Sequence, residues 1–252
     1  MQDRDPGAQD RPLLPAVSPA FAVHRSLAIV GSSSGLRAAG HGAAIDAHHE
    51  VLRFNGAVTE GFEADVGART TVQVIGVDIA YLFNPRYLLP TNNPEADEAN
   101  RHENARRIAA FFPGARIVTF RPDDGTRSPQ FGTARYLRSV APDRPVWYLD
   151  EDGPGAAMAY YTANRDLEAL GLACRLRHGG PRTGMKIVLR CVLAGVRPTL
   201  FGFDVDLTAQ TARHYHDDIT DDPIRGYADH DVLGEMAVLL EMEQRGLVGI
   251  IR

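Results

Sequence analysis

The sequence predicts a single α/β domain in which a mostly parallel sheet carries helices on both faces. Short apolar runs alternate with helix-forming segments along the chain, which is typical of parallel strands joined by helices. One of these runs, residues 27–30, breaks into a glycine, three serines and a second glycine, as a buried strand does when it turns into a helix. With 252 residues, of which 44% are hydrophobic, the chain is long enough to bury one sizeable core.

The expected elements follow from local composition. Strands are expected where short apolar runs end at glycine, asparagine or a polar loop, at residues 27–30, 51–54, 72–76, 116–120, 146–149 and 199–203. Helices are expected at residues 36–47, 99–112 and 156–170, then from residues 181–183 onward, and finally in the amphipathic segment that opens at residue 230.

Charge and composition exclude several classes of function. A net charge of −5 and a pI near 6.0 argue against a nucleic-acid partner, whose phosphates would require a basic face. No stretch approaches the roughly 18 apolar residues of a membrane span, so no integral membrane segment is expected. Residues 1–20 are polar and proline-rich, without the apolar centre of a signal peptide, and are expected to form a disordered arm before a domain at residues 21–252. We therefore expect a cytoplasmic protein.

The turn after the first strand has the chemistry of a nucleotide-binding site. Gly31 would let the backbone come close to a ligand, and the exposed amides around Ser32 and Ser33 suit a phosphate at the start of a helix. The second strand ends in Asn55, at the height where a nucleotide bound to the first turn could be reached.

The loop at residues 61–70 allows two interpretations. Glu63 and Asp65 are close enough in sequence for acid catalysis or metal binding, but an ion-paired loop with Arg69 or Arg53 as the partner would also explain them. We favour the ion-paired loop.

A second candidate region begins at a predicted helix start. Thr183 and Gly184 open this helix, where a hydroxyl group and unpaired amides form a pocket for an anion or a ribose. The strand that follows the helix ends in Gly202 and Phe203.

Histidines close to carboxylates supply the remaining candidates. His214 and His216 are one residue apart and could share a face of a strand, so with Asp217 they could bind a metal. His230 opens the last helix and Glu235 follows it. Because imidazole titrates near neutral pH, His230 is suited to removing a proton from a hydroxyl group as that group attacks.

Together these stretches resemble the sialylmotifs of the animal-type sialyltransferases, glycosyltransferase family 29. The strings LAIVG through GLR, IDAHHEVLRFN and GFEADVGARTT are similar to the large sialylmotif. GGPRTGMKIVLRCVLAGVRPTLFGFDVD is similar to the small motif, in which a Pro-x-Thr-Gly turn precedes a helix and a strand ending in Gly-Phe. HYHD, which begins at His214, looks like the third motif, and His230 with Glu235 is similar to the very small motif, His-x4-Glu.

The resemblance implies a Rossmann-like domain, in the GT-A-like variant, that moves sialic acid from CMP-sialic acid to a glycan or glycolipid hydroxyl with inversion. It implies that His230 takes the acceptor's proton and that His214 hydrogen-bonds the departing phosphate, supported by Glu235, Tyr215 and Asp217. It assigns donor binding to a set of turn and strand-end residues: Gly31, Ser32, Ser33, Asn55, Thr183, Gly184, Gly202 and Phe203. The family needs no divalent metal, so neither a metal nor a cofactor is expected.

The chain also departs from the family pattern. The turn usually written Gly-Asn-Ser-Gly-Asn reads GSSSG here, so both asparagines are lost, and Arg182 takes a place usually held by a small hydroxyl residue. Members from the secretory pathway join the large and small motifs by a disulfide, but the corresponding positions are Leu27 and Gly195. The loss of both cysteines fits a reducing compartment.

Two alternatives to sialic acid transfer stay open at this point. One is a transferase that uses another CMP-activated keto sugar acid, such as CMP-Kdo. The other is a CMP-binding protein that has lost transfer activity, although the retention of His214, His230 and Glu235 argues against it.

Overall fold

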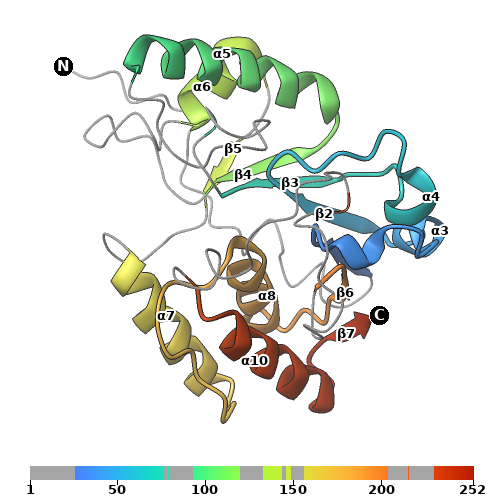
Figure 1. The fold of residues 1–252 in the computed structure, drawn as a ribbon, viewed down its shortest axis with the longest axis vertical. Coiled ribbons are helices and arrows are strands. Elements are labelled where there is room, and N and C mark those ends of the chain that lie inside the picture. The colour runs from blue at the N-terminus through green and yellow to red at the C-terminus, as the bar shows by residue number, and fades with distance from the viewer. Residues whose placement is uncertain are drawn as a thin grey trace.

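The computed structural model describes residues 26–76, 79, 93–119, 133–143, 146–148, 156–203, 215 and 230–252. Within these residues, seven strands form one sheet in the order β5-β4-β3-β2-β1-β6-β7, and every neighbouring pair is parallel (Figure 1). The predicted parallel α/β architecture is confirmed. The predicted disordered arm and the candidate residues His214, His216 and Asp217 lie outside the described residues.

The described elements alternate along the chain as predicted, but three of them were not expected: helices at residues 63–66 and 133–140, and a strand near the C-terminus. The strands are β1 (Leu27–Val30), β2 (Glu50–Phe54), β3 (Val72–Ile75), β4 (Arg116–Thr119), β5 (Val146–Tyr148), β6 (Thr199–Phe201) and β7 (Gly249–Ile251). The helices are the 3-10 turn η1 (Ser34–Leu36), then α3 (Gly42–Asp46), α4 (Glu63–Val66), α5 (Pro94–Phe111), α6 (Thr133–Val140), α7 (Ala156–Ala169), α8 (Thr183–Leu193) and α10 (Val232–Gln244).

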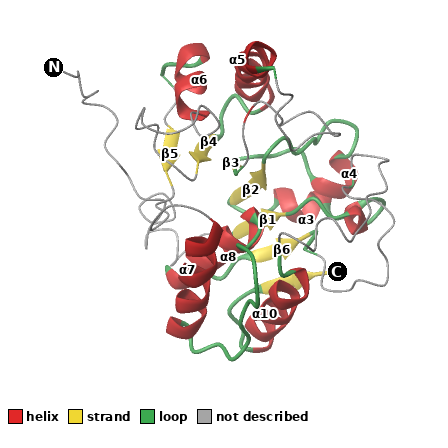
Figure 2. Ribbon diagram, turned by 60° about the vertical axis from the view of Figure 1, so that its left-hand side comes forward, coloured by secondary structure: helices red, strands yellow, loops and turns green. Residues whose placement is uncertain are grey.

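Strand β1 is buried on both faces, as its continuous apolar sequence predicts. Leu27 and Ile29 pack into a core shared with α7, α8 and α10, whereas Ala28 and Val30 pack against α3 and α4. Helices α5 and α6 cover the same face as α3 and α4, but farther along the sheet, over β3 and β4. Figure 2 shows α7, α8 and α10 gathered together and α5 and α6 lying apart from them. Helices therefore cover both faces of the sheet, as expected.

The predicted helix over residues 36–47 is wrong, because the chain leaves helical geometry between η1 and α3. Ala38 and Gly40 have φ values of 60° and 69°, in the left-handed region. The Asp65 carboxylate accepts hydrogen bonds from the backbone N–H groups of Ala38 (2.8 Å) and Gly40 (3.0 Å). These bonds stabilise the turn, and they lower the pKa of Asp65. A carboxylate distant in sequence thus overrides the local helical pattern.

The ion pairs predicted for the loop at residues 61–70 are also wrong, because both arginines bind mainly backbone carbonyls. Arg53 is fully buried and its guanidinium donates to the carbonyls of Val66, Gly67 and Arg69. Arg69 in turn donates to carbonyl oxygens in the segment between α3 and β2. Backbone carbonyls accept most of the hydrogen bonds of these cations, although Nη1 of Arg53 has no partner among the described residues, and the contacts hold the loop against β2.

Glu241 on α10 holds the loop that follows α7, and this contact predicts a loss of stability in acid. Its carboxylate accepts hydrogen bonds from the N–H groups of Ala173 (2.8 Å) and Cys174 (2.8 Å), and it pairs with Arg245 (2.6 Å). The two amide bonds, chiefly, lower the pKa of Glu241 to about 2. A carboxylate with a lowered pKa stabilises the fold fully above its ordinary pKa and loses that contribution as the pH falls toward the lowered value.

We therefore expect the free energy of unfolding to decline between about pH 4.5 and pH 2, and part of this decline to be absent in Glu241→Gln. Urea unfolding at several pH values measures both. Glu168→Gln is the control, because Glu168 is exposed on the neighbouring α7. Equal acid dependence in the unchanged chain and in Glu241→Gln would contradict the assignment.

No helix in the part of the chain that the structure describes combines the length and the apolar character needed to cross a bilayer. Both cysteines are free thiols, and complete burial raises the pKa of Cys191 to about 12. Cys191 is therefore a buried apolar residue of α8, as its sequence context predicts.

Candidate functional site at the switch point of the sheet

The order in which the strands are added to the sheet reverses at β1, and this reversal positions the candidate site. Strands β2 to β5 follow one another on one side of β1, whereas β6 and β7 lie on the other side. In open parallel sheets, ligands bind beyond the carboxyl ends of the strands where the order reverses. The turn after β1 and the turn after β6 meet at this point. The N–H of Gly31 donates to the carbonyl of Phe201 (2.7 Å), and the N–H of Ser33 donates to that of Gly202 (3.3 Å).

Glycine is required on both sides of this junction. A Cβ atom on Gly31 would lie 2.3 Å from the carbonyl oxygen of Gly202, far inside van der Waals contact. Gly202 has a φ of 66°, and a Cβ there would lie 2.4 Å from a methyl carbon of Leu36. The large-motif and small-motif glycines thus serve one structural purpose, which is the close approach of two turns.

The serines of the first turn differ in role: Ser33 makes hydrogen bonds that shape the turn, whereas the backbone N–H groups of Ser32 and Ser34 are left to bind a ligand. Ser33 caps η1, since its hydroxyl accepts a hydrogen bond from the N–H of Gly35 (3.1 Å). Its own N–H is bound to Gly202, as described above. Among the described residues, the N–H groups of Ser32 and Ser34 have no acceptor. The amides that suit a phosphate are therefore those of Ser32 and Ser34, while Ser33 shapes the turn.

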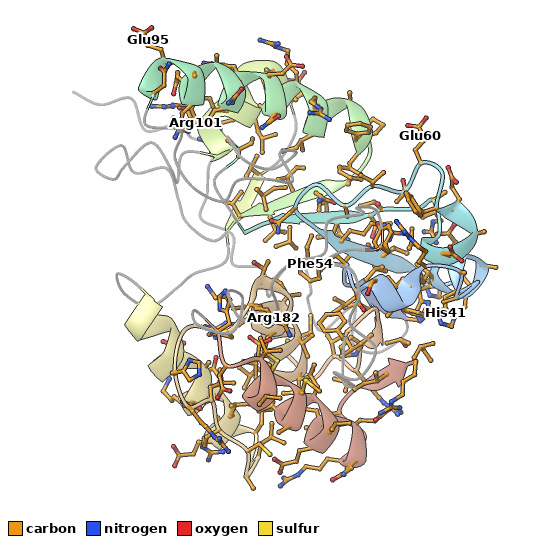
Figure 3. The ribbon with its side chains drawn as sticks, viewed as in Figure 1. His41, Phe54, Glu60, Glu95, Arg101 and Arg182 are labelled. Atoms are coloured by element: carbon orange, nitrogen blue, oxygen red, sulfur yellow. The ribbon has the colours of Figure 1, made fainter. Side chains whose placement is uncertain are left out.

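Helix α8 brings the small motif to the same edge of the sheet. Thr183 is its first residue, and the residue before it supplies no side-chain cap. A Cβ on Gly184 would lie 3.0 Å from the ring of Phe203 and 3.9 Å from the ring of Phe54. Gly184 therefore lets the start of α8 pack against rings that follow β6 and end β2. Figure 3 shows Phe54 between the sheet and α8, and Arg182 at α8.

The arginine that departs from the family pattern pairs with a glutamate of the very small motif. Arg182 donates from its backbone N–H to one oxygen of Glu235 (2.6 Å) and from Nε to the other (2.7 Å). Glu235 is only 2% exposed, so the hydrogen bonds and the ion pair with Arg182 take the place of water around its carboxylate. The predicted supporting residue Glu235 thus joins α10 to the start of α8.

His230 is held by the segment just before α8, at Gly179 and Gly180. Its Nδ1 lies 2.6 Å from the carbonyl oxygen of Gly180, and its backbone forms an antiparallel bridge with Gly179. Because a carbonyl oxygen can only accept, Nδ1 must carry the proton in this contact. In the neutral ring, Nε2 then has the free lone pair and can accept a proton.

Asp231 is a buried capping residue that is not among the predicted candidates. It caps α10, accepting a hydrogen bond from the N–H of Gly234 (2.9 Å), and it also accepts one from the N–H of Arg177 (2.6 Å). It is buried and directly follows His230. An aspartate before an apolar helical run is a recognisable capping signal, but its bond to Arg177 bridges segments far apart in sequence.

Tyr215 of the third motif lies against the large-motif turn. Its backbone N–H donates to the carbonyl of Ser32 (3.0 Å), and its hydroxyl donates to the carbonyl of Val58 (2.5 Å). Arg37 donates from Nε to the Tyr215 carbonyl (2.9 Å). The side chain is completely buried, and this burial raises its pKa to about 12. Tyr215 thus joins the third motif to the large-motif turn, and its supporting role stays a prediction, whereas its neighbour His214 lies outside the described residues.

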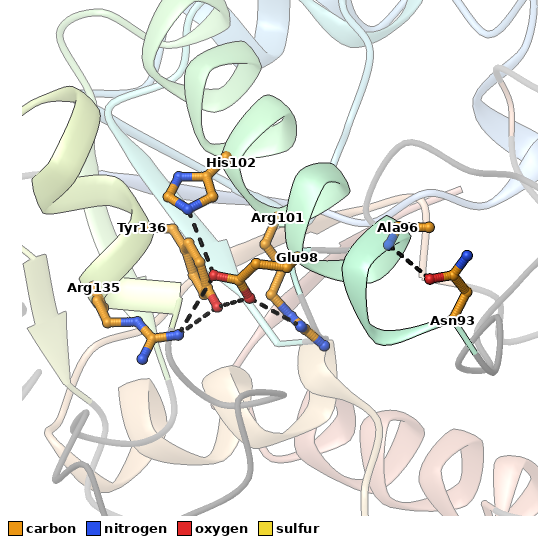
Figure 4. Close-up of polar contacts among 7 residues, drawn as sticks. All are labelled: Asn93, Ala96, Glu98, Arg101, His102, Arg135 and Tyr136. Carbon is orange, nitrogen blue, oxygen red and sulfur yellow. Dashed lines mark hydrogen bonds and ion pairs between the residues drawn. The ribbon is translucent and has the colours of Figure 1, made fainter.

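A second cluster of charged side chains lies away from this junction, between α5 and α6 (Figure 4). Glu98 accepts a hydrogen bond from the hydroxyl of Tyr136 (2.5 Å) and pairs with Arg101 (3.4 Å). Arg135 lies over the ring of Tyr136, with its guanidinium carbon 4.7 Å from the ring centre. The bond from Tyr136, chiefly, lowers the pKa of Glu98. These contacts join two helices and have the features of a structural network.

Within the described ranges, no group of three or more histidine, cysteine, aspartate or glutamate side chains could hold a metal ion. His214 and His216 lie beyond those ranges. Metal-independent activity therefore stays a prediction.

Comparison with known proteins shows what the chain is similar to. Residues 13–97 match the family model described as glycosyltransferase family 29 (sialyltransferase). The resemblance to glycosyltransferase family 29 is confirmed. This match covers the large motif, from before β1 to the start of α5.

Individual members of the sialyltransferase family agree with the match. The chain is 45% identical over 128 residues to beta-galactoside alpha-2,6-sialyltransferase 2 of Takifugu rubripes, which covers 50% of this chain and 22% of that protein. It is 51% identical over 47 residues to CMP-N-acetylneuraminate-beta-galactosamide-alpha-2,3-sialyltransferase 2 of Mus musculus, covering 19% of this chain and 13% of that protein. The chain thus spans only a minor part of the length of these relatives.

Solved structures of a mammalian sialyltransferase share the fold. One aligns over 94% of this chain and 72% of its own, with a TM-score of 0.56 and 20% identity. The other, described in complex with Gal-beta-1-3GalNAc-ortho-nitrophenol, aligns over 90% of this chain and 69% of its own, with a TM-score of 0.53 and 21% identity. The likeness therefore extends well beyond the large motif, to almost the whole chain.

Proposed function

We propose that this chain transfers sialic acid from CMP-sialic acid to a hydroxyl group of an acceptor glycan, with inversion at the anomeric carbon. The resemblance to sialyltransferases supports the reaction class. The observation that carries the proposal is the contact between His230 and Gly180, because it leaves Nε2 of a histidine as a base beside the start of α8.

The proposed reaction is a single displacement. Nε2 of His230 takes the proton of the acceptor hydroxyl while the hydroxyl oxygen bonds to the anomeric carbon of the donor. The bond between this carbon and the phosphate oxygen breaks, and CMP leaves with the electron pair. Alignment of the hydroxyl with the donor and stabilisation of the departing phosphate would supply most of the rate acceleration.

The leaving phosphate would lie at the junction of the two turns. The N–H groups of Ser32 and Ser34 are open there, and Thr183 lies at the positive end of the α8 dipole. The family pattern adds His214 as a hydrogen-bond donor to this phosphate.

The first test is nucleotide choice. CMP should stabilise the fold more than UMP, AMP or NAD does, because its binding free energy is added only to the folded state. At a CMP concentration 100 times its Kd the gain is roughly 2.7 kcal/mol, which is large enough to appear as a rise in Tm. A rise with NAD and none with CMP would refute a CMP-sugar site.

The second test follows the reaction itself. Incubation with CMP-sialic acid and a mixed set of glycan acceptors should release CMP and form a sialylated product, whose anomeric configuration NMR can assign. Product from CMP-Kdo alone would replace sialic acid by another keto sugar acid. CMP binding without hydrolysis or transfer of any CMP-sugar would indicate a binding protein.

A further inference from the structure

The backbone of Asn55 is unusual at the end of β2. Its φ of 50° lies in the left-handed region, which residues other than glycine rarely adopt. Asn55 directly follows Phe54, whose ring is near the start of α8, and β2 is the neighbour of β1. Among residues other than glycine, asparagine adopts this region most readily, and here it does so beside the proposed nucleotide site.

Three hydrogen bonds hold this conformation. The N–H of Asn55 donates to the carbonyl of Val74 (2.7 Å), and its side-chain Oδ1 accepts from the N–H of Gly76 (2.9 Å). The carbonyl of Asn55 accepts from Nε2 of Gln73. All three partners belong to β3 or to the residue that follows it, so β3 sets the geometry of the end of β2.

These bonds fix which end of the Asn55 amide faces outward. Since the N–H of Gly76 can only donate, the atom it meets must be the oxygen. Nδ2 is then left over, and among the described residues it has no acceptor. Asn55 thus offers N–H donors, and the ligand atom that it meets must be an acceptor, such as a phosphate oxygen, a ribose oxygen or a cytosine acceptor atom.

Gln73 is an unexpected residue at its position. It is completely buried in β3, and although its Nε2 binds Asn55, its Oε1 has no partner among the described residues. A buried acceptor without a donor lowers stability, so an apolar side chain of similar size would suit the sheet better. The contact that Gln73 does make is with the residue proposed to bind the nucleotide.

We propose that Gln73 is a positioning residue: it holds Asn55 in the left-handed conformation and so presents Asn55 Nδ2 to an acceptor atom of the CMP moiety. This inference rests on the proposed function, since it assumes that CMP binds at the switch point. Gln73 acts only through Asn55 and does not touch the ligand.

The test is a double-mutant cycle read by CMP affinity and by Tm. Gln73→Met should weaken CMP binding about tenfold, the loss expected for one well-placed hydrogen bond, while Tm stays unchanged or rises. Asn55→Gly tolerates the positive φ, removes the donor, and should weaken CMP binding at least as much. In the Asn55→Gly background, Gln73→Met should have no further effect on affinity, because its partner's side chain is gone.

A matched control is Asn104→Met on α5. Asn104 is also a buried amide that donates to a backbone carbonyl, that of Ile79 (2.7 Å). Unlike Gln73, it belongs to α5, which lies away from the junction. This variant should lower Tm and leave CMP affinity unchanged. Additive effects of Gln73→Met and Asn55→Gly, or equal loss of affinity in the Asn104 control, would overturn the proposal.

A second variant covers the case in which Gln73→Met does not fold. Asn55→Asp keeps an oxygen for the N–H of Gly76 but replaces the Nδ2 donor by a second oxygen. It should keep Tm and lose CMP affinity by about tenfold or more, and unchanged affinity would overturn the proposal. Repeating the titrations with cytidine locates the contact, because a loss seen with CMP alone places it on the phosphate. If the unchanged chain binds no CMP, the proposed function itself fails.

Discussion

Replacement of His230 by alanine is expected to lower kcat about 10²–10⁴-fold, the usual cost of losing a general base, and to leave the Kd for CMP nearly unchanged. The base acts only as the acceptor loses its proton, so it contributes little to binding of the donor. Steady-state kinetics for transfer and calorimetric titration with CMP measure the two quantities separately.

His178→Ala is the matched control for this experiment. His178 is exposed and lies just before Gly179, the residue that pairs with His230, but nothing places its side chain in the site. This variant should keep both kcat and CMP affinity. The assignment of His230 fails if His230→Ala retains most of its activity, or if its main defect is in CMP binding.

Replacement of Gly31 by alanine is expected to destabilise the fold by about 3 kcal/mol and to abolish CMP binding. The new Cβ would lie 2.3 Å from the carbonyl oxygen of Gly202, and a backbone carbonyl cannot move aside as a flexible side chain can. To relieve the overlap, the turns must separate, and the bonds from Gly31 to Phe201 and from Ser33 to Gly202 must lengthen or break. Urea unfolding and CMP titration report the two effects.

Gly114→Ala separates this effect from the general consequence of adding a methyl group. Gly114 is not in the left-handed region, so alanine can adopt its backbone conformation, and a Cβ there would meet nothing within 4 Å. This variant should change stability by a few tenths of a kcal/mol at most, because surface substitutions of this kind usually do. Equal stability of Gly31→Ala and Gly114→Ala would show that the two turns are not in close contact.

The alternation of strands and helices could be predicted from the sequence because its signals are local. The continuous apolar run of β1 indicates a buried strand, and Gly171, with its positive φ, ends α7. Each signal depends only on residues a few positions away. The break between η1 and α3 could not be predicted in this way. It depends on Asp65, whose carboxylate reaches back to the amides of Ala38 and Gly40. Local propensity was outweighed by a contact that exists only after folding.

In the candidate site, too, some residues could be predicted from the sequence, whereas the contacts that hold them could not. Gly31 and His230 are candidates from residue type and position in the sequence, and the family resemblance adds Gly202, because motif glycines and histidines can be read directly from sequence. Their partners were not predictable, since the Gly180 carbonyl that orients His230 belongs to the backbone and carries no side-chain signal. The pairing of Arg182 with Glu235 was missed for a related reason, because it joins residues from two separate motifs.

The position of β1 between β2 and β6 has a consequence for synthesis of the chain. Strand β2 follows β1 closely, but β6 is made only after α8. Until then β1, apolar on both faces, keeps one row of backbone hydrogen-bonding groups unpaired. Such a row is a template for association with other unfinished chains. Docking of β6 removes this hazard in the same step that brings the two turns of the junction together, so a substitution that weakens the Gly31–Gly202 junction would lower both the yield of folded protein and its activity.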